Sequence, residues 1–362
     1  MRTFFKPLLV LISFIFSFQN VVLSEEKCEY VYKVSDVRDL ALIYQGGLHR
    51  LDWTQEQFVP YVTHTFADGH KDWLFDGFLF LEFKDAKGYC YASGYAPKKA
   101  RRTEWEWLLG RLFEKDKALD ALDKCIEAEK KEIGEPGFKH KVVLGIASAL
   151  PGQTDWGELD GDSLDFNNRA DQVKACKWYI DRLIENFGNA EYKNLELSGF
   201  YWVDEDTIHC KGLPRDLSPY IHSKGYKFVW IPYWKARGYD HWKEFGFDIA
   251  YQQPNHFFNH SIPDSRLDDA CKVASENGMA MEFECDSKAL YGIEGSSYGR
   301  MEAYIDAFIR NKVFERSAVA YYTGSWGILD LYKSKTPEDQ SIMDRLAKII
   351  VERRKNGSLV EK

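Results

Sequence analysis

The most constraining feature of this sequence is an alternation of two patterns that runs along almost the whole chain. Runs rich in apolar and β-branched residues alternate with stretches whose apolar residues recur every three or four positions, as in a helix. Such alternation is typical of βα units that build a parallel sheet. We expect eight strands, at residues 39–47, 73–83, 141–150, 195–205, 226–234, 247–255, 278–286 and 317–326.

Eight βα units predict an α/β fold of the single (β/α)8 TIM-barrel type. Helical periodicity is clear at residues 103–113, 171–184, 265–278, 299–311 and 336–357. The last helix is expected to begin at Thr336 and Pro337 and to end at Gly357. The competing fold is an open doubly wound sheet, but no expected strand is followed by a glycine-rich phosphate-binding turn.

The first 24 residues have the pattern of a secretory signal peptide. Arg2 and Lys6 precede the apolar run 8–18, and the small residue Ser24 precedes Glu25. The apolar run is shorter than the roughly 20 residues needed to span a bilayer. We therefore expect residues 1–24 to be removed and residues 25–362 to form one barrel domain, secreted or periplasmic and not inserted in a membrane.

Charge and cysteine spacing narrow the classes of partner and cofactor. The formal net charge is −8 and no block of Lys and Arg alternates with aromatic residues, which argues against a nucleic-acid partner. The seven cysteines are widely scattered, without CxxC or Cys/His metal spacing. We expect mostly packed thiols with room for one or two disulfides, no cofactor, no catalytic metal and a monomer.

Carboxylates gather at the ends of two expected strands. The fourth strand ends in Asp204, Glu205 and Asp206, and the seventh carries Glu282 and Glu284. The active site of a barrel of this kind lies at the C-terminal ends of its strands. Residues two apart share one face of a strand, so Glu282 and Glu284 point the same way, about 6.6 Å apart along it. An inward-facing pair of acids is costly unless it serves a function.

Two carboxyl groups facing each other across a pocket are the minimal equipment for cleaving a glycosidic bond. One protonates the leaving oxygen, and the other attacks the anomeric carbon or activates a water. Acids after the fourth strand and on the seventh are the arrangement of a large clan of retaining barrel glycosidases. We expect Glu205 to be the acid/base and Glu282 or Glu284 the nucleophile, with retention favoured over inversion. Glu282 is narrowly preferred because an aromatic residue follows it, although Glu284 lies nearer to the mouth.

Neutral amides and aromatic rings near the strand ends suit the recognition of a carbohydrate substrate. The expected substrate-binding residues are Glu82, Trp202, Asp204, Tyr233, Gln252, Gln253, Asn255, His256 and Trp326. Trp202 is equally compatible with a place in the core. Asp76, which precedes Glu82 on the second expected strand, is expected to serve structure.

Several of these segments together resemble the domain of unknown function 4855, an exported bacterial family. The resemblance spans about residues 34–326 and rests on "WLFDGFLFLEF", "GFYWVDE", "FVWIPYW", "FDIAYQQPNHFF" and "GMAMEFE". It implies a barrel fold and a glycoside hydrolase that acts on a polysaccharide or oligosaccharide.

Other functions stay open on the sequence. One is a barrel that binds glycans without turning them over, and another is a carbohydrate esterase or lyase. Asp204 to Asp206 could also cap a turn, and Glu282 could pair with a basic residue. Hydrolases of other classes need motifs that this sequence lacks, since it has no GxSxG, HExxH or P-loop. A metal-dependent barrel hydrolase would need His-x-His early in the chain, and "LHRLDW" has one His. Catalysis would require Glu205 and one acid of the seventh strand to face each other, with carboxyl groups about 5–5.5 Å apart for retention or about 6.5–9.5 Å for inversion.

Overall fold

Eight parallel strands close into a barrel in the computed structural model, which describes residues 36–46 and 50–356. Around the barrel the strands follow the order β1, β14, β13, β12, β11, β10, β7, β4. Their bounds are β1 Asp39–Tyr44, β4 Gly77–Leu81, β7 His140–Ile146, β10 Leu195–Trp202, β11 Lys227–Trp230, β12 Ile249–Gln252, β13 Ala280–Glu284 and β14 Val319–Tyr322. The predicted (β/α)8 barrel is confirmed, while the predicted signal peptide lies outside the described residues.

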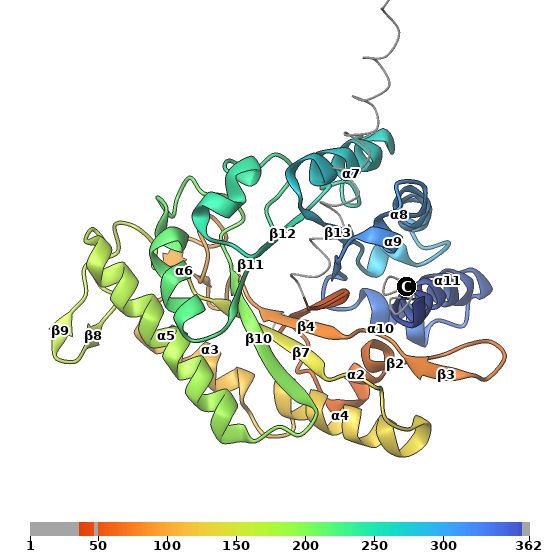
Figure 1. The fold of residues 1–362 in the computed structure, drawn as a ribbon, viewed down its shortest axis with the longest axis horizontal. Helices are drawn as coiled ribbons and strands as arrows, with labels where there is room; N and C mark the ends of the chain where they lie inside the picture. The colour runs from red at the N-terminus through yellow and green to blue at the C-terminus, as the bar shows by residue number, and fades with distance from the viewer. Residues whose placement is uncertain (1–35, 47–49, 357–362) are drawn as a thin grey trace, which may run out of the picture.

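Helices cover the outside of the barrel, with α3, α5 and α6 on one side, α8, α9 and α11 on the other, and α4 below, next to α2 (Figure 1). Their bounds are α2 Gln55–Val62, α3 Arg102–Leu112, α4 Ala118–Ile133, α5 Arg169–Ala190, α6 Leu213–Ser223, α7 Ser265–Asn277, α8 Tyr298–Arg310, α9 Val313–Arg316, α10 Gly327–Lys333 and α11 Pro337–Asn356, with short 3-10 helices η1 Tyr239–Phe245 and η2 Ser287–Ala289. The last helix begins at Pro337, as its sequence predicts. Acidic residues in its first turn and basic residues in its last turn complement the helix dipole.

Three two-stranded ribbons lie outside the barrel. They are β2 Thr63–Thr65 with β3 Lys71–Trp73, β5 Tyr89–Cys90 with β6 Lys98–Lys99, and β8 Glu158–Leu159 with β9 Asp162–Ser163. The first and the last project from opposite sides of the molecule (Figure 1). The second barrel strand was expected to begin at Trp73 but begins at Gly77, because Trp73 pairs with Thr63 in the first ribbon.

A buried polar network closes the N-terminal end of the barrel. The Asp76 carboxylate accepts hydrogen bonds from the backbone N–H of Arg38 at 3.0 Å and of Asp39 at 2.8 Å. Asp39 in turn pairs with Arg353 of α11 at 2.6 Å and accepts from the Tyr321 hydroxyl at 2.6 Å. Asp76 therefore has the structural role expected of it, at the end of the barrel away from the strand ends that carry the acids.

The barrel interior and the layer between barrel and helices form separate apolar cores. Along β13, Met281 and Phe283 pack outward against the helices, whereas Ala280 points inward. Because strand residues alternate, Glu282 and Glu284 share the inward direction of Ala280. The described cysteines are all free and buried, as the expectation of packed thiols requires, and they are Cys90, Cys125, Cys176, Cys210, Cys271 and Cys285.

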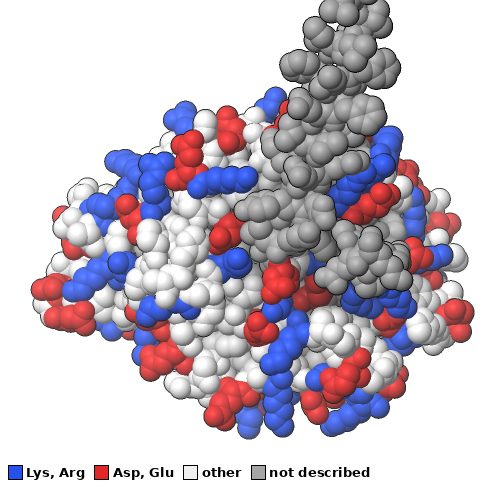
Figure 2. Space-filling view, in the orientation of Figure 1, with Lys and Arg blue, Asp and Glu red and all other residues white. Residues whose placement is uncertain are grey.

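Acidic and basic side chains are interspersed over the face of the molecule seen in Figure 2. No extended area of one sign stands out among the coloured atoms of that face. In residues 36–46 and 50–356, no helix has both the length and the apolar character required to cross a membrane.

Candidate active site

Three carboxylates meet in one pocket at the C-terminal end of the barrel. Glu282 and Glu284 come from the inward side of β13, and Glu205 follows the end of β10. The pocket has a volume of about 300 Å³. It is lined by Leu42, Tyr44, Arg50, Phe83, Lys84, Tyr95, Tyr201, Glu205, Ile231, Gln253, Asn255, Phe258, Glu282, Glu284 and Tyr322. The lining thus combines acids with aromatic rings, amides and two basic side chains.

Strand alternation explains which acid of the run 204–206 reaches the pocket. Tyr201 belongs to the inner core, whereas Trp202 belongs to the outer core against the helices. Glu205 continues the direction of Tyr201 and lines the pocket. Asp204 continues the direction of Trp202, and its buried carboxylate accepts a hydrogen bond from the Ser148 hydroxyl at 2.6 Å. Only the middle acid of the three is therefore placed for chemistry.

Two amide side chains connect Glu205 to Glu284. Gln253 Nε2 donates to Glu205 Oε1 at 2.6 Å. Asn255 Nδ2 donates to Gln253 Oε1 at 3.1 Å and lies 3.4 Å from Glu284 Oε1. The loop after β12 therefore ties the acid that follows the fourth barrel strand to the acid on the seventh.

Glu284 is surrounded by hydrogen-bond donors. The Tyr304 hydroxyl of α8 and the backbone N–H of His256 both donate to Glu284 Oε2, the latter at 3.1 Å. Burial raises the pKa of Glu284, but these hydrogen bonds oppose the increase because they stabilise the charged form. These donors therefore limit, without cancelling, the increase in pKa that burial causes.

Glu282 lies deeper in the barrel and has a different environment. The residue is 3% exposed, and within the described part of the chain no hydrogen bond opposes the effect of its burial. Burial, together with the nearby Glu284 and Glu205, raises the pKa of Glu282 well above the ordinary glutamate value. Of the two acids on β13, Glu282 therefore holds a proton more readily, and Glu284 is the one that ionises first.

Glu205 keeps its proton close to neutral pH. Burial raises the pKa of Glu205 to about 7, and the charge of Glu284 adds to this increase while the hydrogen bond from Gln253 opposes it. A carboxyl group with this pKa is suited to general acid catalysis at neutral pH. The pocket thus holds one acid that retains its proton near neutral pH and a second whose charged form is stabilised by hydrogen-bond donors, which is the kind of difference that acid–nucleophile chemistry needs.

A sequence profile of the domain of unknown function DUF4855 matches residues 39–348 of this chain. The chain belongs to the DUF4855 family. A search of curated proteins found no match.

Solved structures with folds similar to this DUF4855 protein come from several enzyme classes. GH26C from Muricauda sp. MAR_2010_75 is 8% identical, with a TM-score of 0.42 over 88% of this chain and 93% of that chain. A GH5-4 broad specificity endoglucanase from an uncultured bacterium is 9% identical, with a TM-score of 0.44 over 89% and 95%. D-psicose 3-epimerase is 11% identical, with a TM-score of 0.40 over 84% and 96%. Barrels host many unrelated chemistries, so function has to be argued from the site residues of the DUF4855 chain itself.

Some of the residues predicted for the DUF4855 site do line the pocket, and they are Glu205, Gln253, Asn255, Glu282 and Glu284. Two others act from behind the pocket wall. The buried Glu82 binds Arg50 through two contacts of 3.0 and 3.1 Å, which fixes the guanidinium group at the pocket. The ring of His256 is buried, but its backbone N–H reaches Glu284.

The remaining predicted binding residues of this DUF4855 domain do not line the pocket. Trp202 is buried between barrel and helices, and Gln252 is also buried, with its amide donating to the carbonyl of Tyr233 at 3.3 Å. The Tyr233 hydroxyl donates to Asp206 at 3.1 Å. Trp326 is 44% exposed, just before α10. Neighbours on a strand point in opposite directions, so a run of polar or aromatic residues at a strand end sends only alternate members into the pocket.

Several site residues of the DUF4855 chain were not identified from sequence. Tyr201 could have been, because it lies on the same side of its strand as Glu205. Arg50 comes from a loop and Tyr304 from a helix, where residue type alone gives no signal. Within the described ranges, no group of three or more His, Cys, Asp or Glu side chains is arranged to hold a metal ion.

Proposed function

We propose that this protein is a retaining glycoside hydrolase in which Glu205 is the general acid/base and Glu284 the nucleophile. The observation that carries the proposal is the contrast between two acids in one pocket. The pKa of Glu205 is raised to about 7, mainly by burial. Glu284 instead accepts hydrogen bonds from Tyr304 and from the backbone of His256, which stabilise its charge.

In the first step, the Glu205 carboxyl donates its proton to the glycosidic oxygen while the Glu284 carboxylate attacks the anomeric carbon. The bond between that carbon and the glycosidic oxygen breaks, and the leaving sugar departs with the proton. Glu284 is now an ester and carries no charge. Because the charge of Glu284 helps to raise the pKa of Glu205, loss of this charge on esterification lowers that pKa, so that Glu205, which has given its proton to the leaving sugar, stays ionised.

In the second step, the Glu205 carboxylate removes a proton from a water molecule that attacks the anomeric carbon. The bond to Glu284 breaks, Glu284 leaves as a carboxylate, and the sugar is released with its original configuration. The two amides between the acids hydrogen-bond both carboxyl groups without adding charge, which supports this alternation of Glu205 between acid and base.

The geometry favours Glu284 as nucleophile over Glu282, which the sequence narrowly preferred. Glu284 is the last residue of β13, nearer to the mouth, and accepts hydrogen bonds that stabilise its ionised form. Glu282 lies deeper, and its raised pKa favours the neutral form. We assign Glu282 to the floor of the pocket, as a neutral group beneath the nucleophile.

The rest of the lining supports a polysaccharide or oligosaccharide as substrate. Aromatic side chains of the pocket offer flat faces to sugar rings, and they are Tyr44, Phe83, Tyr95, Tyr201, Phe258 and Tyr322. Phe258 is 48% exposed, which leaves its ring accessible to a ligand. We further propose that the protein acts after export, in the periplasm or outside the cell, because residues 1–24 have the pattern of a signal peptide.

The test is to incubate the purified protein with a panel of plant and host polysaccharides and to measure released reducing sugar. Glu205→Gln and Glu284→Gln are expected to abolish release. Glu196→Gln is the matched control, because Glu196 lies at the start of β10 and pairs with Lys141 there. Proton NMR of the first product formed gives the anomeric configuration, which should be retained.

Other outcomes would replace the proposal. Binding of a glycan without turnover would indicate a non-catalytic glycan-binding barrel. Release of acetate or of an unsaturated sugar would indicate an esterase or a lyase. An inverted first product would show that Glu284 activates water instead of attacking the sugar.

A further inference from the structure

We propose that Arg300 of α8 is a positioning residue for Glu284, and that it acts by holding the loop between β12 and α7 in the shape that presents hydrogen-bond donors to this carboxylate. The catalytic meaning of this inference rests on the proposed role of Glu284 as nucleophile. The inference about the loop itself can be tested without turnover.

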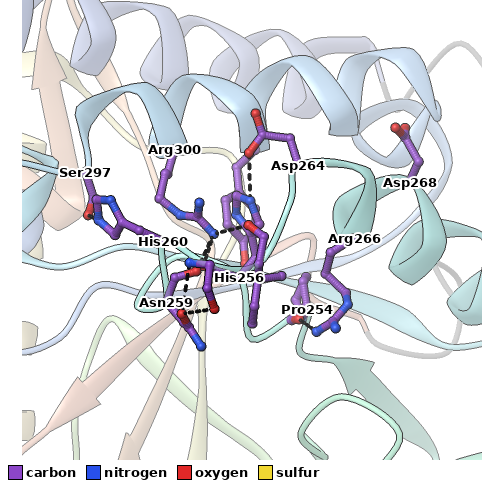
Figure 3. A network of polar contacts seen from close by, with 12 residues as sticks. Pro254, His256, Asn259, His260, Asp264, Arg266, Asp268, Ser297 and Arg300 are labelled. Carbon is purple, nitrogen blue, oxygen red and sulfur yellow. Dashed lines mark hydrogen bonds and ion pairs between the residues drawn. The ribbon is translucent and has the colours of Figure 1, made fainter.

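Arg300 holds the loop through its carbonyl groups. The Nη2 atom of Arg300 donates to the carbonyl oxygen of His256, and it lies 3.0 Å from that of Asn259 and 3.1 Å from that of Ile262. Figure 3 shows the Arg300 side chain extending from its helix to the loop, where dashed lines mark these contacts. Three carbonyls from separate parts of the loop thus converge on one guanidinium nitrogen.

The loop presents its donors to Glu284 through a left-handed turn at Asn255. Asn255 has φ of +47°, a conformation that Asn adopts more readily than most residues with a Cβ but that its surroundings still have to hold. The turn directs the backbone N–H groups of His256 and Phe257 toward the Glu284 carboxylate, a concave arrangement that binds anions. If Asn255 relaxed to an ordinary conformation, these donors would turn away from Glu284 together.

The ring of His256 anchors the loop from a second side. Its Nε2 lies 2.9 Å from the carboxylate of Asp264, and its ring packs edge to face against Tyr304 with centroids 5.5 Å apart. Arg300 and Tyr304 are four residues apart on α8 and so lie on the same side of that helix. One side of α8 therefore contributes to the environment of Glu284 in two ways. Tyr304 donates a hydrogen bond to it directly, and Arg300 holds the loop whose backbone donates to it.

The charge of Arg300 also acts on Glu284, so the test has to separate charge from loop shape. Groups that interact electrostatically with Glu284 come from several elements, and they are Glu282 and Cys285 in and after β13, Glu205 after β10, Tyr322 on β14, and Tyr304 and Arg300 on α8. Asp264 gives the needed contrast, because it is negative and lies on the other side of His256. Removing that charge alone should make Glu284 more acidic, whereas loosening the loop should make it less acidic.

The experiment follows the titration of Glu284 by carbon NMR of glutamate-labelled protein, with Glu284→Gln to assign the signal. The variants are Arg300→Met, Arg300→Lys and Asp264→Ala, and the control is Arg310→Met. Arg310 lies on the same helix but pairs with the partly exposed Asp268, away from the loop. We expect the titration midpoint of Glu284 to rise by about one pH unit in Arg300→Met, a tenfold change in acidity constant. A smaller rise is expected in Arg300→Lys and Asp264→Ala, and none in the control.

A second readout applies if a substrate has been found. The acidic limb of the kcat/KM profile should move upward with the NMR midpoint, and kcat should fall by up to about 100-fold as donors leave their positions. Absence of turnover would count against the proposed function alone, because the NMR midpoint is measured in the free protein.

Two results would overturn the inference. One is an unchanged midpoint in folded Arg300→Met. The other is a wild-type midpoint in Arg300→Lys together with a lower midpoint in Asp264→Ala, which would show that Arg300 acts by its charge alone. Asp264 is 68% exposed, so Asp264→Ala should fold. If the Arg300 variants do not fold, a wild-type or lower midpoint in Asp264→Ala would overturn the inference, because it would show that loosening the loop does not move the donors of Glu284.

Discussion

Glu205 and Glu284 are connected through the side chains of Gln253 and Asn255, with contacts of 2.6 Å to Glu205 and 3.4 Å to Glu284. The two acids come from the fourth and the seventh strands of the barrel, and the bridging amides follow the sixth. A change of charge at Glu284 therefore alters the pKa of Glu205, and the hydrogen-bonded amides link the positions of the two carboxyl groups.

The effect of removing the acid should depend on the leaving group. Glu205→Gln is expected to lower kcat/KM by about 10²–10⁴-fold on natural glycosides, because their leaving groups need protonation. On aryl glycosides with acidic phenols the loss should be smaller. Azide should partly rescue Glu205→Ala on such substrates and give a glycosyl azide of retained configuration. Near wild-type rates of Glu205→Gln on a polysaccharide would show that Glu205 does not have this role.

The two acids on β13 should differ in their effect on turnover. Glu284→Gln is expected to abolish activity on every substrate, including those with good leaving groups, because no glycosyl ester can form. Glu282→Gln should retain measurable activity, since Gln resembles the neutral form that the raised pKa of Glu282 favours. Single-turnover kinetics with an activated aryl glycoside measure the remaining activity of each variant. The reverse result would make Glu282 the nucleophile.

The pH dependence of activity should have its basic limb near neutrality. Because the pKa of Glu205 is raised to about 7, its proton is present below this pH and is lost above it. We expect kcat/KM to fall about tenfold per pH unit above about pH 7. In Glu284→Gln the negative neighbour is gone, so the pKa of Glu205 measured by NMR should decrease. An unchanged value would mean that the two acids are not coupled.

The polar network at the N-terminal end of the barrel should matter for stability only. Arg353 and Asp39 form a buried ion pair, with side chains 6% and 3% exposed. Arg353→Met leaves Asp39 buried without its counter-ion and should lower the free energy of unfolding by about 3–5 kcal/mol. Adding Asp39→Asn should recover part of this loss. Urea denaturation measures the free energy of unfolding of the single and the double variant. The folded variants should keep wild-type activity.

The exported protein should begin near Glu25. N-terminal sequencing of protein recovered from the periplasm or the medium tests this prediction. Leu11→Asp, which interrupts the apolar run, is expected to block export. Recovery of chains that still begin at Met1 from the membrane fraction would contradict cleavage.

Local sequence was sufficient for the barrel and for part of the site. Eight apolar runs separated by helical periodicity predict eight parallel strands, and strand alternation alone places Glu282 and Glu284 on one side of β13. The same rule, counted from Tyr201, brings Glu205 to the pocket and sends Asp204 and Trp202 away from it. Sequence alone did not show which of these side chains point into the barrel, because this depends on which side of the strand meets the helices. A register shift in β10 between Leu197 and Gly199 also interrupts a simple count along the strand.

Tertiary structure decided how the acids differ. Glu282 and Glu284 are the same residue type on the same side of one strand, and the aromatic residue after Glu282, which narrowly favoured it as nucleophile, gave no information about the donors around each acid. Their environments differ because the donors come from elsewhere in the chain. The Tyr304 hydroxyl on α8 and the backbone N–H of His256 after β12 donate to Glu284 and not to Glu282. Charge and proton affinity in a buried site depend on such long-range donors and on depth, which only the closed barrel determines.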